Sequence, residues 1–208
     1  MQRLVIIGCS GNASEILEDV ASTHDVVAVL DDNPALAGHT FHGIPVAPLS
    51  TVGDHPDARF LFTIGSEKSF RRRAELLSSL HLPRDRFATF IHPSAHVSAR
   101  ASVGTGAILY PGVVVTAGAT LGDHVVVLPN TVIQHDTRIG DFTLIGANVT
   151  IAGGCTVGDS CYIGSASSIR NGITVGPGAL IGMAANVTRD VAAESVVAGN
   201  PARPMPPA

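Results

Sequence analysis

The chain has 208 residues, of which only 14% are charged, and its formal net charge is −4. This length suits one large domain or two small ones, and the low charge content excludes an intrinsically disordered chain. The 13 lysines and arginines are spread thinly along the sequence, which excludes the basic stripe that nucleic-acid binding requires.

Membrane spans, targeting signals and disulfides are not expected either. No apolar run approaches the roughly 20 residues of a membrane-spanning helix, and the N-terminus lacks a signal-peptide pattern. The cysteines Cys9, Cys155 and Cys161 form no C-x-x-C pair, which predicts reduced thiols and no structural zinc. We therefore expect a cytoplasmic protein with neither nucleic acid nor membrane as a partner.

The first 86 residues alternate between short apolar strands and amphipathic helices. This alternation predicts a small parallel sheet covered by helices, about half the size of a full dinucleotide-binding fold. Three consecutive arginines, residues 71–73, fall on the second helix, where we expect a solvent-exposed face, with a phosphate contact as the alternative. We expect strands over residues 3–7, 26–30, 60–64 and 87–91, and helices over residues 14–22 and 69–80.

A glycine-rich turn, residues 8–13, reads G-C-S-G-N-A and joins the first strand to the first helix. Free backbone N–H groups and the positive end of a helix dipole make such a turn suitable for phosphate binding. Asp31 and Asp32 end the second strand, where a carboxylate can accept hydrogen bonds from ribose hydroxyls. A plain strand–helix turn is the alternative, because the loop departs from G-x-G-x-x-G. We expect this part of the chain to bind a nucleoside diphosphate that is attached to another group. The predicted binding residues are Gly8, Ser10, Gly11, Asn12, Asp31 and Asp32.

From Ile91 to Val187 an aliphatic residue occupies every sixth position, 17 times without a gap. A period of six fits neither a helix nor an alternating strand, but it fits a short strand followed by a tight corner. Three such edges make a triangular coil, and stacked coils bury the aliphatic residues in a continuous core. Cys155 and Cys161 occupy equivalent small positions of consecutive hexapeptides, so we expect both in this core.

Of the nine histidines, only His135 stands in a setting that suggests a mechanism, V-I-Q-H-D-T-R-I-G-D. It follows a core aliphatic residue by two positions, which places it near an edge of the coil. A neutral imidazole can take a proton from an amine, and Asp136 or Asp141 could fix its tautomer. Chemistry alone leaves open that His135 is an ordinary surface residue.

The two halves together resemble the hexapeptide-repeat nucleotide-sugar N-acetyltransferases of the bacillosamine and perosamine type, which group with the sialic-acid O-acetyltransferases. The resemblance rests on the opening G-x-S-G, the strand end L-D-D, the hexapeptide run and the closing G-N-P-A-R. It implies an α/β half-Rossmann domain that binds the nucleotide sugar over residues 1–86. A left-handed parallel β-helix with a C-terminal cap is implied over residues 87–208, in a homotrimer with active sites between subunits.

The resemblance also implies an activity, acetyl-CoA-dependent N-acetylation of an amino sugar linked to UDP, GDP or TDP, in glycan biosynthesis and without a metal. His135 matches the general base of the family and Asp136 its acidic neighbour. Gly153 matches the glycine whose N–H faces the thioester carbonyl. Arg203 could meet the CoA phosphates, and a simple cap of the β-helix is the alternative role of its segment. The residues expected to contact acetyl-CoA are Gly153, Gly164, Met183 and Arg203.

Two positions depart from the family pattern and leave the acceptor and the acyl group open. Asn12 stands where relatives have a histidine after the loop glycine, and Leu144 stands where they have a histidine in F-S-H-I. The alternatives are O-acetylation of a sugar such as sialic acid and a non-catalytic, nucleotide-binding trimeric scaffold. Metal-assisted hydration is a further class, but the three-histidine spacing that it needs is missing.

Overall fold

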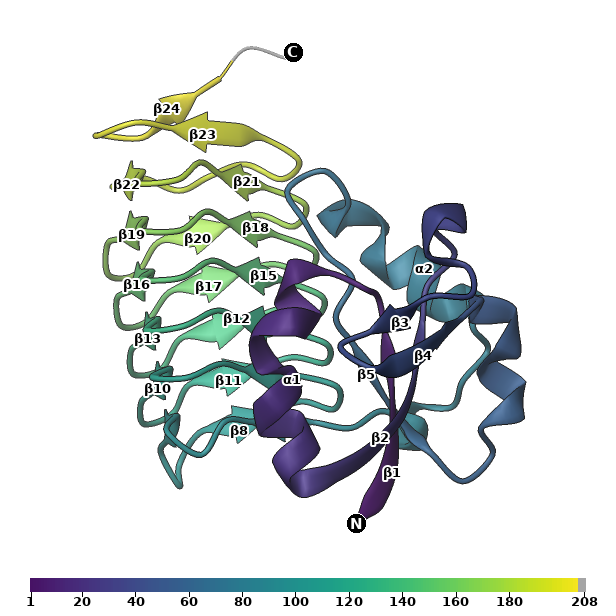
Figure 1. Ribbon diagram of the computed structural model, residues 1–208. Coiled ribbons are helices and arrows are strands. Elements are labelled where there is room, and N and C mark those ends of the chain that lie inside the picture. The colour runs from purple at the N-terminus through teal and green to yellow at the C-terminus, as the bar shows by residue number, and fades with distance from the viewer. Residues whose placement is uncertain (206–208) are drawn as a thin grey trace. The chain divides into compact units, whose positions relative to one another are not determined.

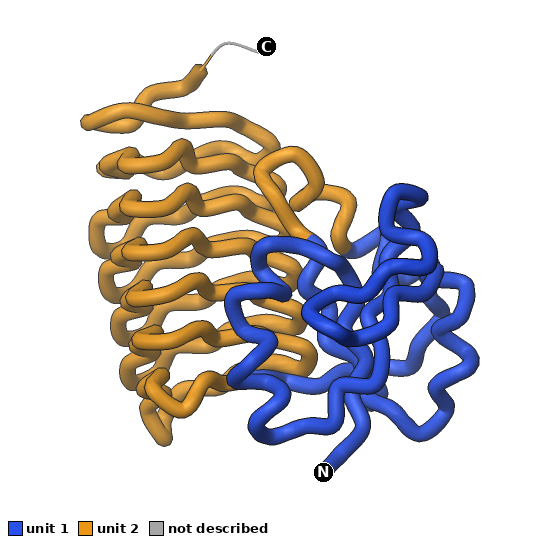
Figure 2. The backbone as a smooth tube through the Cα atoms, viewed as in Figure 1, with its two compact units in different colours: residues 1–64, 74–90 blue, residues 65–73, 91–208 orange. Residues whose placement is uncertain are grey.

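The computed structural model describes residues 1–205, and the chain divides into two compact units (Figures 1 and 2). Unit 1 comprises residues 1–64 and 74–90, and unit 2 comprises residues 65–73 and 91–205, so the last three residues of the predicted C-terminal cap lie outside the described residues. Residues 65–73 thus fold with the second unit, although the sequence pattern places them inside the first predicted domain.

Unit 1 is built on a five-stranded sheet with the order β3-β4-β2-β1-β5. Strands β2, β1 and β5 are parallel, β4 is parallel to β2, and only β3 runs antiparallel to its neighbour. The strands are β1 (Gln2–Ile7), β2 (His24–Leu30), β3 (Thr40–Phe41), β4 (Ile44–Ala47) and β5 (Arg59–Phe62). The α-helices are α1 (Gly11–Thr23) and α2 (Arg73–Ser79), of which Arg73 belongs to unit 2, and short 3₁₀ turns span Pro34–Leu36, Leu49–Asp54 and Arg84–Arg86. A further 3₁₀ turn, Phe70–Arg72, belongs to unit 2.

Helix α1 begins three residues before its predicted start because Ser10 caps it. The Ser10 Oγ accepts a hydrogen bond from the Ala13 N–H at 3.3 Å, which satisfies one of the N–H groups that a helix start leaves without a partner. The helix then buries one side, formed by Ala13, Ile16, Leu17 and Val20. The predicted second helix is shorter than expected, because a 3₁₀ turn precedes α2.

Unit 2 is a left-handed parallel β-helix, which confirms the predicted fold class. Each of the 17 predicted aliphatic residues is the second residue of a two-residue strand. These strands are β6 (Phe90–Ile91), β7 (His96–Val97), β8 (Ser102–Val103), β9 (Ile108–Leu109), β10 (Val114–Val115), β11 (Thr120–Leu121), β12 (Val126–Val127), β13 (Val132–Ile133), β14 (Arg138–Ile139), β15 (Leu144–Ile145), β16 (Thr150–Ile151), β17 (Thr156–Val157), β18 (Tyr162–Ile163), β19 (Ser168–Ile169), β20 (Thr174–Val175), β21 (Leu180–Ile181) and β22 (Asn186–Val187). A hairpin of β23 (Val196–Ala198) and β24 (Arg203–Pro204) closes the unit.

Strands three apart in the chain pair in parallel and form three sheets (Figure 1). Val114 on β10, for example, is paired with His96 on β7 and with Val132 on β13. One coil therefore advances the chain by 18 residues, as three hexapeptides predict. The core aliphatic residues from Leu109 to Val187 are buried.

The corners between strands need a left-handed backbone, and residues with positive φ recur at equivalent positions of successive coils. One such corner holds Gly118, Asp136, Gly154 and Gly172, with φ of 75°, 59°, 71° and 70°. Glycine adopts this region freely, and aspartate is among the few other residues that tolerate it. Asp136 therefore has a structural role at its corner in addition to any chemical one.

Hydroxyl and thiol groups inside the β-helix donate to carbonyls of the following coil. Thr143 Oγ1 donates to the Gly158 carbonyl at 2.9 Å and accepts from the Cys161 N–H at 3.1 Å. The Cys161 thiol continues the pattern by donating to the Gly176 carbonyl at 3.2 Å, and burial raises its pKa to about 11. Cys155 and Cys161 are fully buried, as predicted, and they act as donors rather than as simple apolar filler.

Replacing Thr143 by valine should destabilise the β-helix by about 1–3 kcal/mol, because a buried N–H and a buried carbonyl then lose their partner. Denaturant unfolding would measure the change. Thr143→Ser is the matched control, since it keeps the hydroxyl and removes only a methyl group. Equal stability of the valine and serine variants would contradict a role for the hydroxyl.

The arginine triplet is not the uniformly exposed face that the sequence suggested, and the prediction is wrong for Arg73. This side chain is 1% exposed, and its Nη1 donates to the carbonyls of His124 at 3.0 Å and Phe142 at 2.6 Å. Burial lowers the Arg73 pKa to about 9. Arg71 and Arg72 are exposed. The difference arises because the carbonyls that Arg73 binds lie 51 and 69 residues away in the sequence.

Candidate functional site

His135 projects from an edge of the β-helix, beside the corner that Asp136 forms. Its Nδ1 lies 2.9 Å from Asp136 Oδ2, and the two side chains are 62% and 73% exposed. A carboxylate at Nδ1 favours the tautomer with the proton on that nitrogen, which leaves Nε2 with a lone pair for a substrate. The Asp136 N–H donates to the Ala117 carbonyl at 3.1 Å and fixes the corner from which the carboxylate extends.

Gly153 lies one coil beyond His135 and directly against its ring. A Cβ added at Gly153 would overlap His135 Nε2 and Cε1. The neighbouring Gly154 N–H donates to the His135 carbonyl at 2.9 Å, which fixes the two coils relative to each other. The structure therefore brings together the three residues predicted for the chemistry, His135, Asp136 and Gly153.

Asp141, the alternative partner of His135, forms hydrogen bonds with other aspartates instead. Its Oδ1 accepts the N–H of Asp123 at 2.8 Å, and its own N–H donates to Asp159 Oδ1 at 2.9 Å. These three aspartates are 18 residues apart and form a ladder that joins successive coils. Asp136 is thus the carboxylate that contacts His135.

Replacing Asp136 by asparagine should lower turnover by roughly fivefold, since an exposed charged contact contributes up to about 1 kcal/mol. Asparagine tolerates the positive φ of this corner, so the fold should be unaffected. Steady-state kcat together with a thermal melt would test this expectation. Unchanged turnover in a folded Asp136→Asn protein would restrict Asp136 to its role in the corner.

The other residues predicted for acetyl-CoA are found at two further places in unit 2. Gly164 lies against the backbone of Met183, and the Met183 side chain is 71% exposed. Both lie beside the corner that contains Ala166 and Ala184. That corner is a different one from the Asp136 corner, so within one chain Gly164 and Met183 are not brought to His135.

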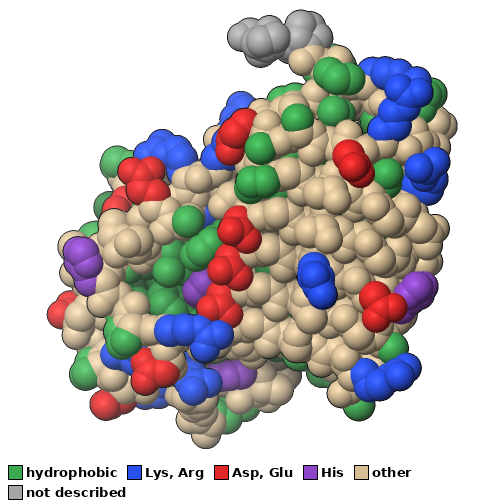
Figure 3. Space-filling view, turned by 180° about the vertical axis from the view of Figure 1, so that it is seen from behind, with side chains coloured by type: hydrophobic (Ala, Val, Ile, Leu, Met, Phe, Trp, Pro, Cys, Tyr) green, Lys and Arg blue, Asp and Glu red, His purple; other side chains and the backbone are tan. Residues whose placement is uncertain are grey.

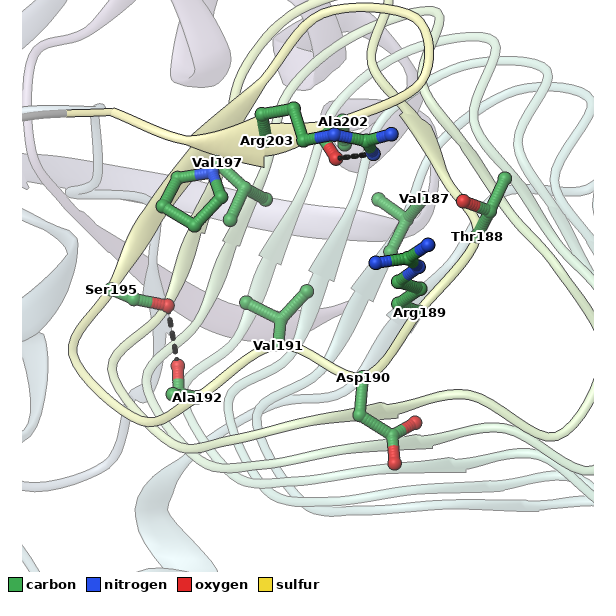
Figure 4. Close-up of a pocket in the computed structure, with 11 residues that line it drawn as sticks. Val187, Thr188, Arg189, Asp190, Val191, Ala192, Ser195, Val197, Ala202 and Arg203 are labelled. Atoms are coloured by element: carbon green, nitrogen blue, oxygen red, sulfur yellow. Dashed lines mark hydrogen bonds between the residues drawn. The ribbon is translucent and has the colours of Figure 1, made fainter.

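Arg203 lines a cavity of about 320 Å³ at the C-terminal end of the β-helix (Figure 4). The valines Val187, Val191 and Val197 and the guanidinium groups of Arg189 and Arg203 surround this cavity. It therefore combines an apolar surface with two guanidinium groups and one carboxylate, that of Asp190.

Arg189 was not identified from the sequence, although the hexapeptide period could have found it. It follows the core residue Val187 by two positions, as His135 follows Ile133, and both cores lie in strands of the same sheet. Arg189 thus occupies the edge position of His135 three coils later, which is about 14 Å along the column at a strand spacing of about 4.8 Å.

In unit 1 the glycine-rich turn and the acidic pair lie together. Asp31 Oδ2 accepts the N–H of Cys9 within the turn at 2.8 Å, and its Oδ1 accepts the Asn33 N–H at 2.8 Å. Asp32 Oδ1 accepts the Leu49 N–H at 2.8 Å. Asp31 and Asp32 line a cavity of about 230 Å³.

The remaining predicted residues of the turn have identifiable structural roles. Gly8 adopts a φ of 110° that few other residues could take, Ser10 caps α1, and Gly11 is its first residue. Asn12 is half-buried in the first turn of the same helix. Burial and the nearby Asp31 carboxylate raise the pKa of the Cys9 thiol.

Leu144, which replaces a histidine of the family pattern, is buried on β15. Its sheet, which contains β12, β15 and β18, is not the sheet of β13 from which His135 follows. Within one chain, Leu144 therefore does not face the imidazole.

No helix within residues 1–205 is long and apolar enough to cross a membrane. The same part of the chain contains no group of three or more side chains that could together hold a metal ion. Charged side chains on the face drawn in Figure 3 are scattered between larger uncharged areas.

Comparisons with known proteins cover both units. A family model described as bacterial transferase hexapeptide (six repeats) matches residues 118–153. A UDP-N-acetylbacillosamine N-acetyltransferase of Bacillus subtilis (strain 168) is 33% identical over 114 residues, which is 52% of this chain and 51% of that protein. The match thus spans about half the length of this relative.

Two solved structures extend the similarity to nearly the whole chain. The acetyltransferase domain of PglB from Neisseria gonorrhoeae FA1090, in complex with acetyl coenzyme A, has a TM-score of 0.85 and 27% identity and covers 98% of this chain and 99% of its own. A variant of perosamine N-acetyltransferase from Caulobacter crescentus, in complex with CoA and GDP-perosamine, has a TM-score of 0.87 and 28% identity, with coverage of 98% and 97%. These similarities confirm that the chain resembles the hexapeptide-repeat nucleotide-sugar N-acetyltransferases, as its sequence predicts.

Proposed function

We propose that the protein is an acetyl-CoA-dependent N-acetyltransferase that acts on a nucleotide-linked amino sugar, as a cytoplasmic enzyme of glycan biosynthesis. The observation that carries the proposal is the cluster of His135, Asp136 and Gly153 at one edge of the β-helix. Its support is the similarity to solved structures whose ligands are acetyl coenzyme A, CoA and GDP-perosamine.

In the proposed reaction, the sugar amine attacks the thioester carbonyl while His135 Nε2 takes the proton from the nitrogen. The new C–N bond replaces the C–S bond, and the proton passes to the departing CoA thiolate. Asp136 at Nδ1 stabilises the imidazolium that forms in between. The Gly153 N–H is proposed to donate to the carbonyl oxygen as negative charge develops there.

Unit 1 is proposed to bind the nucleotide sugar. Its glycine-rich turn at the start of α1 offers backbone N–H groups and a helix dipole to a diphosphate, and Asp31 and Asp32 line a cavity of the same unit. Both carboxylates already accept one or two backbone hydrogen bonds, so they hold their places before a ligand arrives.

Acetyl-CoA is proposed to follow the edge of the β-helix from His135 towards the C-terminal cavity. Arg189 and Arg203 line this cavity and suit the CoA phosphates, because guanidinium groups bind phosphate oxygens with paired hydrogen bonds. Gly164 and Met183 lie beside another corner, so they would reach the cofactor from a neighbouring subunit of a homotrimer. The active site would then lie between two subunits.

The proposal is tested by following CoA thiol release with the purified protein and acetyl-CoA. Amino sugars linked to UDP, GDP and TDP should be acetylated, whereas the corresponding hydroxy sugars should not. Preference for the hydroxy analogues or for free sialic acid would instead establish O-acetylation. Nucleotide binding without any acetyl transfer would establish a non-catalytic scaffold.

A further inference from the structure

Residues Gly65–Arg73, which we call the strap, are packed tightly against the β-helix at both ends. At the far end, Arg73 is buried and binds the carbonyls of His124 and Phe142. At the near end, Gly65 lies against the Leu144 side chain, since a Cβ added to Gly65 would lie 2.7 Å from Leu144 Cδ1 and would displace it. These contacts hold the backbone of the strap in place.

The middle of the strap is anchored as well. Phe70 is 2% exposed and packs against Tyr162, with 5.7 Å between ring centroids. Arg71 Nε donates to the Gly178 carbonyl at 2.9 Å and pairs with a Glu194 carboxylate oxygen at 2.9 Å. Together with the Arg73 contacts, this extends the strap along several coils on one corner of the β-helix, since His124, Phe142, Gly178 and Glu194 are residues of that corner.

The two residues that precede the strap hold the glycine-rich turn of unit 1. Thr63 is buried, and its Oγ1 donates to the carbonyls of Ile7 at 3.0 Å and Gly8 at 3.1 Å. The Ile64 side chain packs so closely on Gly8 that an added Cβ would lie 2.5 Å from Ile64 Cγ1. A single peptide bond, from Ile64 to Gly65, therefore joins the residues that hold the turn to the strap.

We propose that the strap is a positioning element for the glycine-rich turn and that Arg71 is a positioning residue within it. Fixing the strap on the β-helix restricts the backbone that holds Gly8, so the turn has less conformational freedom to lose when a ligand binds. Only the identity of that ligand, a nucleoside diphosphate, rests on the proposed function; the role of the strap does not.

Hydrogen–deuterium exchange of the turn provides a test that needs no ligand. Arg71→Ala removes the contacts of a partly exposed side chain with Gly178 and Glu194, and it should speed exchange of the amides of residues 9–13. Lys68→Ala is the matched control, since it removes the same charge from an exposed position of the same strap. Unchanged exchange in Arg71→Ala, or equal acceleration in Lys68→Ala, would overturn the proposal.

Ligand affinity gives the second readout. Arg71→Ala should weaken binding of UDP or GDP by about fivefold, the scale of an exposed ion pair, while acetyl-CoA binding stays unchanged. In a Thr63→Val background, which lacks the two side-chain hydrogen bonds to Ile7 and Gly8, Arg71→Ala should have a smaller further effect on nucleotide affinity than in the parent. A lower melting temperature with unchanged nucleotide affinity would reduce the strap to a stabilising role. A parent protein that binds neither nucleotide would contradict the proposed function, whereas the exchange result would still decide the role of the strap.

Discussion

Turnover should fall by between about 10² and 10⁴-fold when His135 is replaced by alanine, the range expected for loss of a general base. The imidazole is 62% exposed and its one hydrogen-bonded partner, Asp136, is itself at the surface, so the fold should survive the change. Initial rates of CoA release at saturating substrate would measure the effect, with a thermal melt to confirm folding.

His96→Ala is the matched control for this experiment, because His96 is another exposed histidine of the β-helix, located on its second strand β7. His135→Asn adds a second variant that keeps hydrogen bonding but offers no base near neutral pH. If both variants of His135 turn over like the parent, His135 has no place in the mechanism and a different proton acceptor must be sought.

Gly153→Ala is expected to have the second largest effect, a loss of turnover on the order of 10²-fold. The new methyl group would occupy space that the His135 ring fills, and a displacement of about 1 Å in a reacting group can cost this much. The φ of Gly153 is not in the positive region, so alanine should not strain the backbone. Steady-state kcat and the melting temperature would separate displacement of the ring from loss of structure.

A double variant shows whether Gly153 acts through His135. If the methyl group only displaces the ring, His135→Ala with Gly153→Ala should be no slower than His135→Ala alone. Asn171→Ala, one coil further along the same edge, is the control for a change at this edge without a clash. A double variant much slower than His135→Ala would assign Gly153 a direct contribution to the reaction, as expected for a donor to the carbonyl oxygen.

The β-helix was predictable because its signal is local and repeated. Every hexapeptide carries its own aliphatic residue, and each strand from β6 to β22 ends on one, so the period needs no knowledge of distant contacts. The edge position of His135 follows from the same period, whereas the choice of Asp136 over Asp141 as its partner comes from the family resemblance. The contact between His135 and Gly153 is equally regular, since 18 residues separate them.

The features that the sequence did not reveal depend on contacts that are not part of the repeating pattern. The sequence alone suggests that Arg73 is a surface arginine, because the two carbonyls that it binds belong to residues far along the chain. The hairpin of β3 and β4 was missed because Gly43 and Pro45 interrupt the apolar pattern that marks a strand. The role of Asp31 in holding the turn through the Cys9 N–H likewise appears only once the two strands lie side by side.

His135, Gly153, Asn171 and Arg189 follow one another at intervals of 18 residues, so this edge of the β-helix presents one residue per coil at a regular spacing. Removing or inserting one whole coil would change the separation of the imidazole from the terminal guanidinium groups in steps of about 4.8 Å. Every core aliphatic residue and every left-handed corner would keep its place in register. A β-helix of this kind can fit carriers of the acyl group that differ in length by gaining or losing whole coils, while the packing of its interior stays the same.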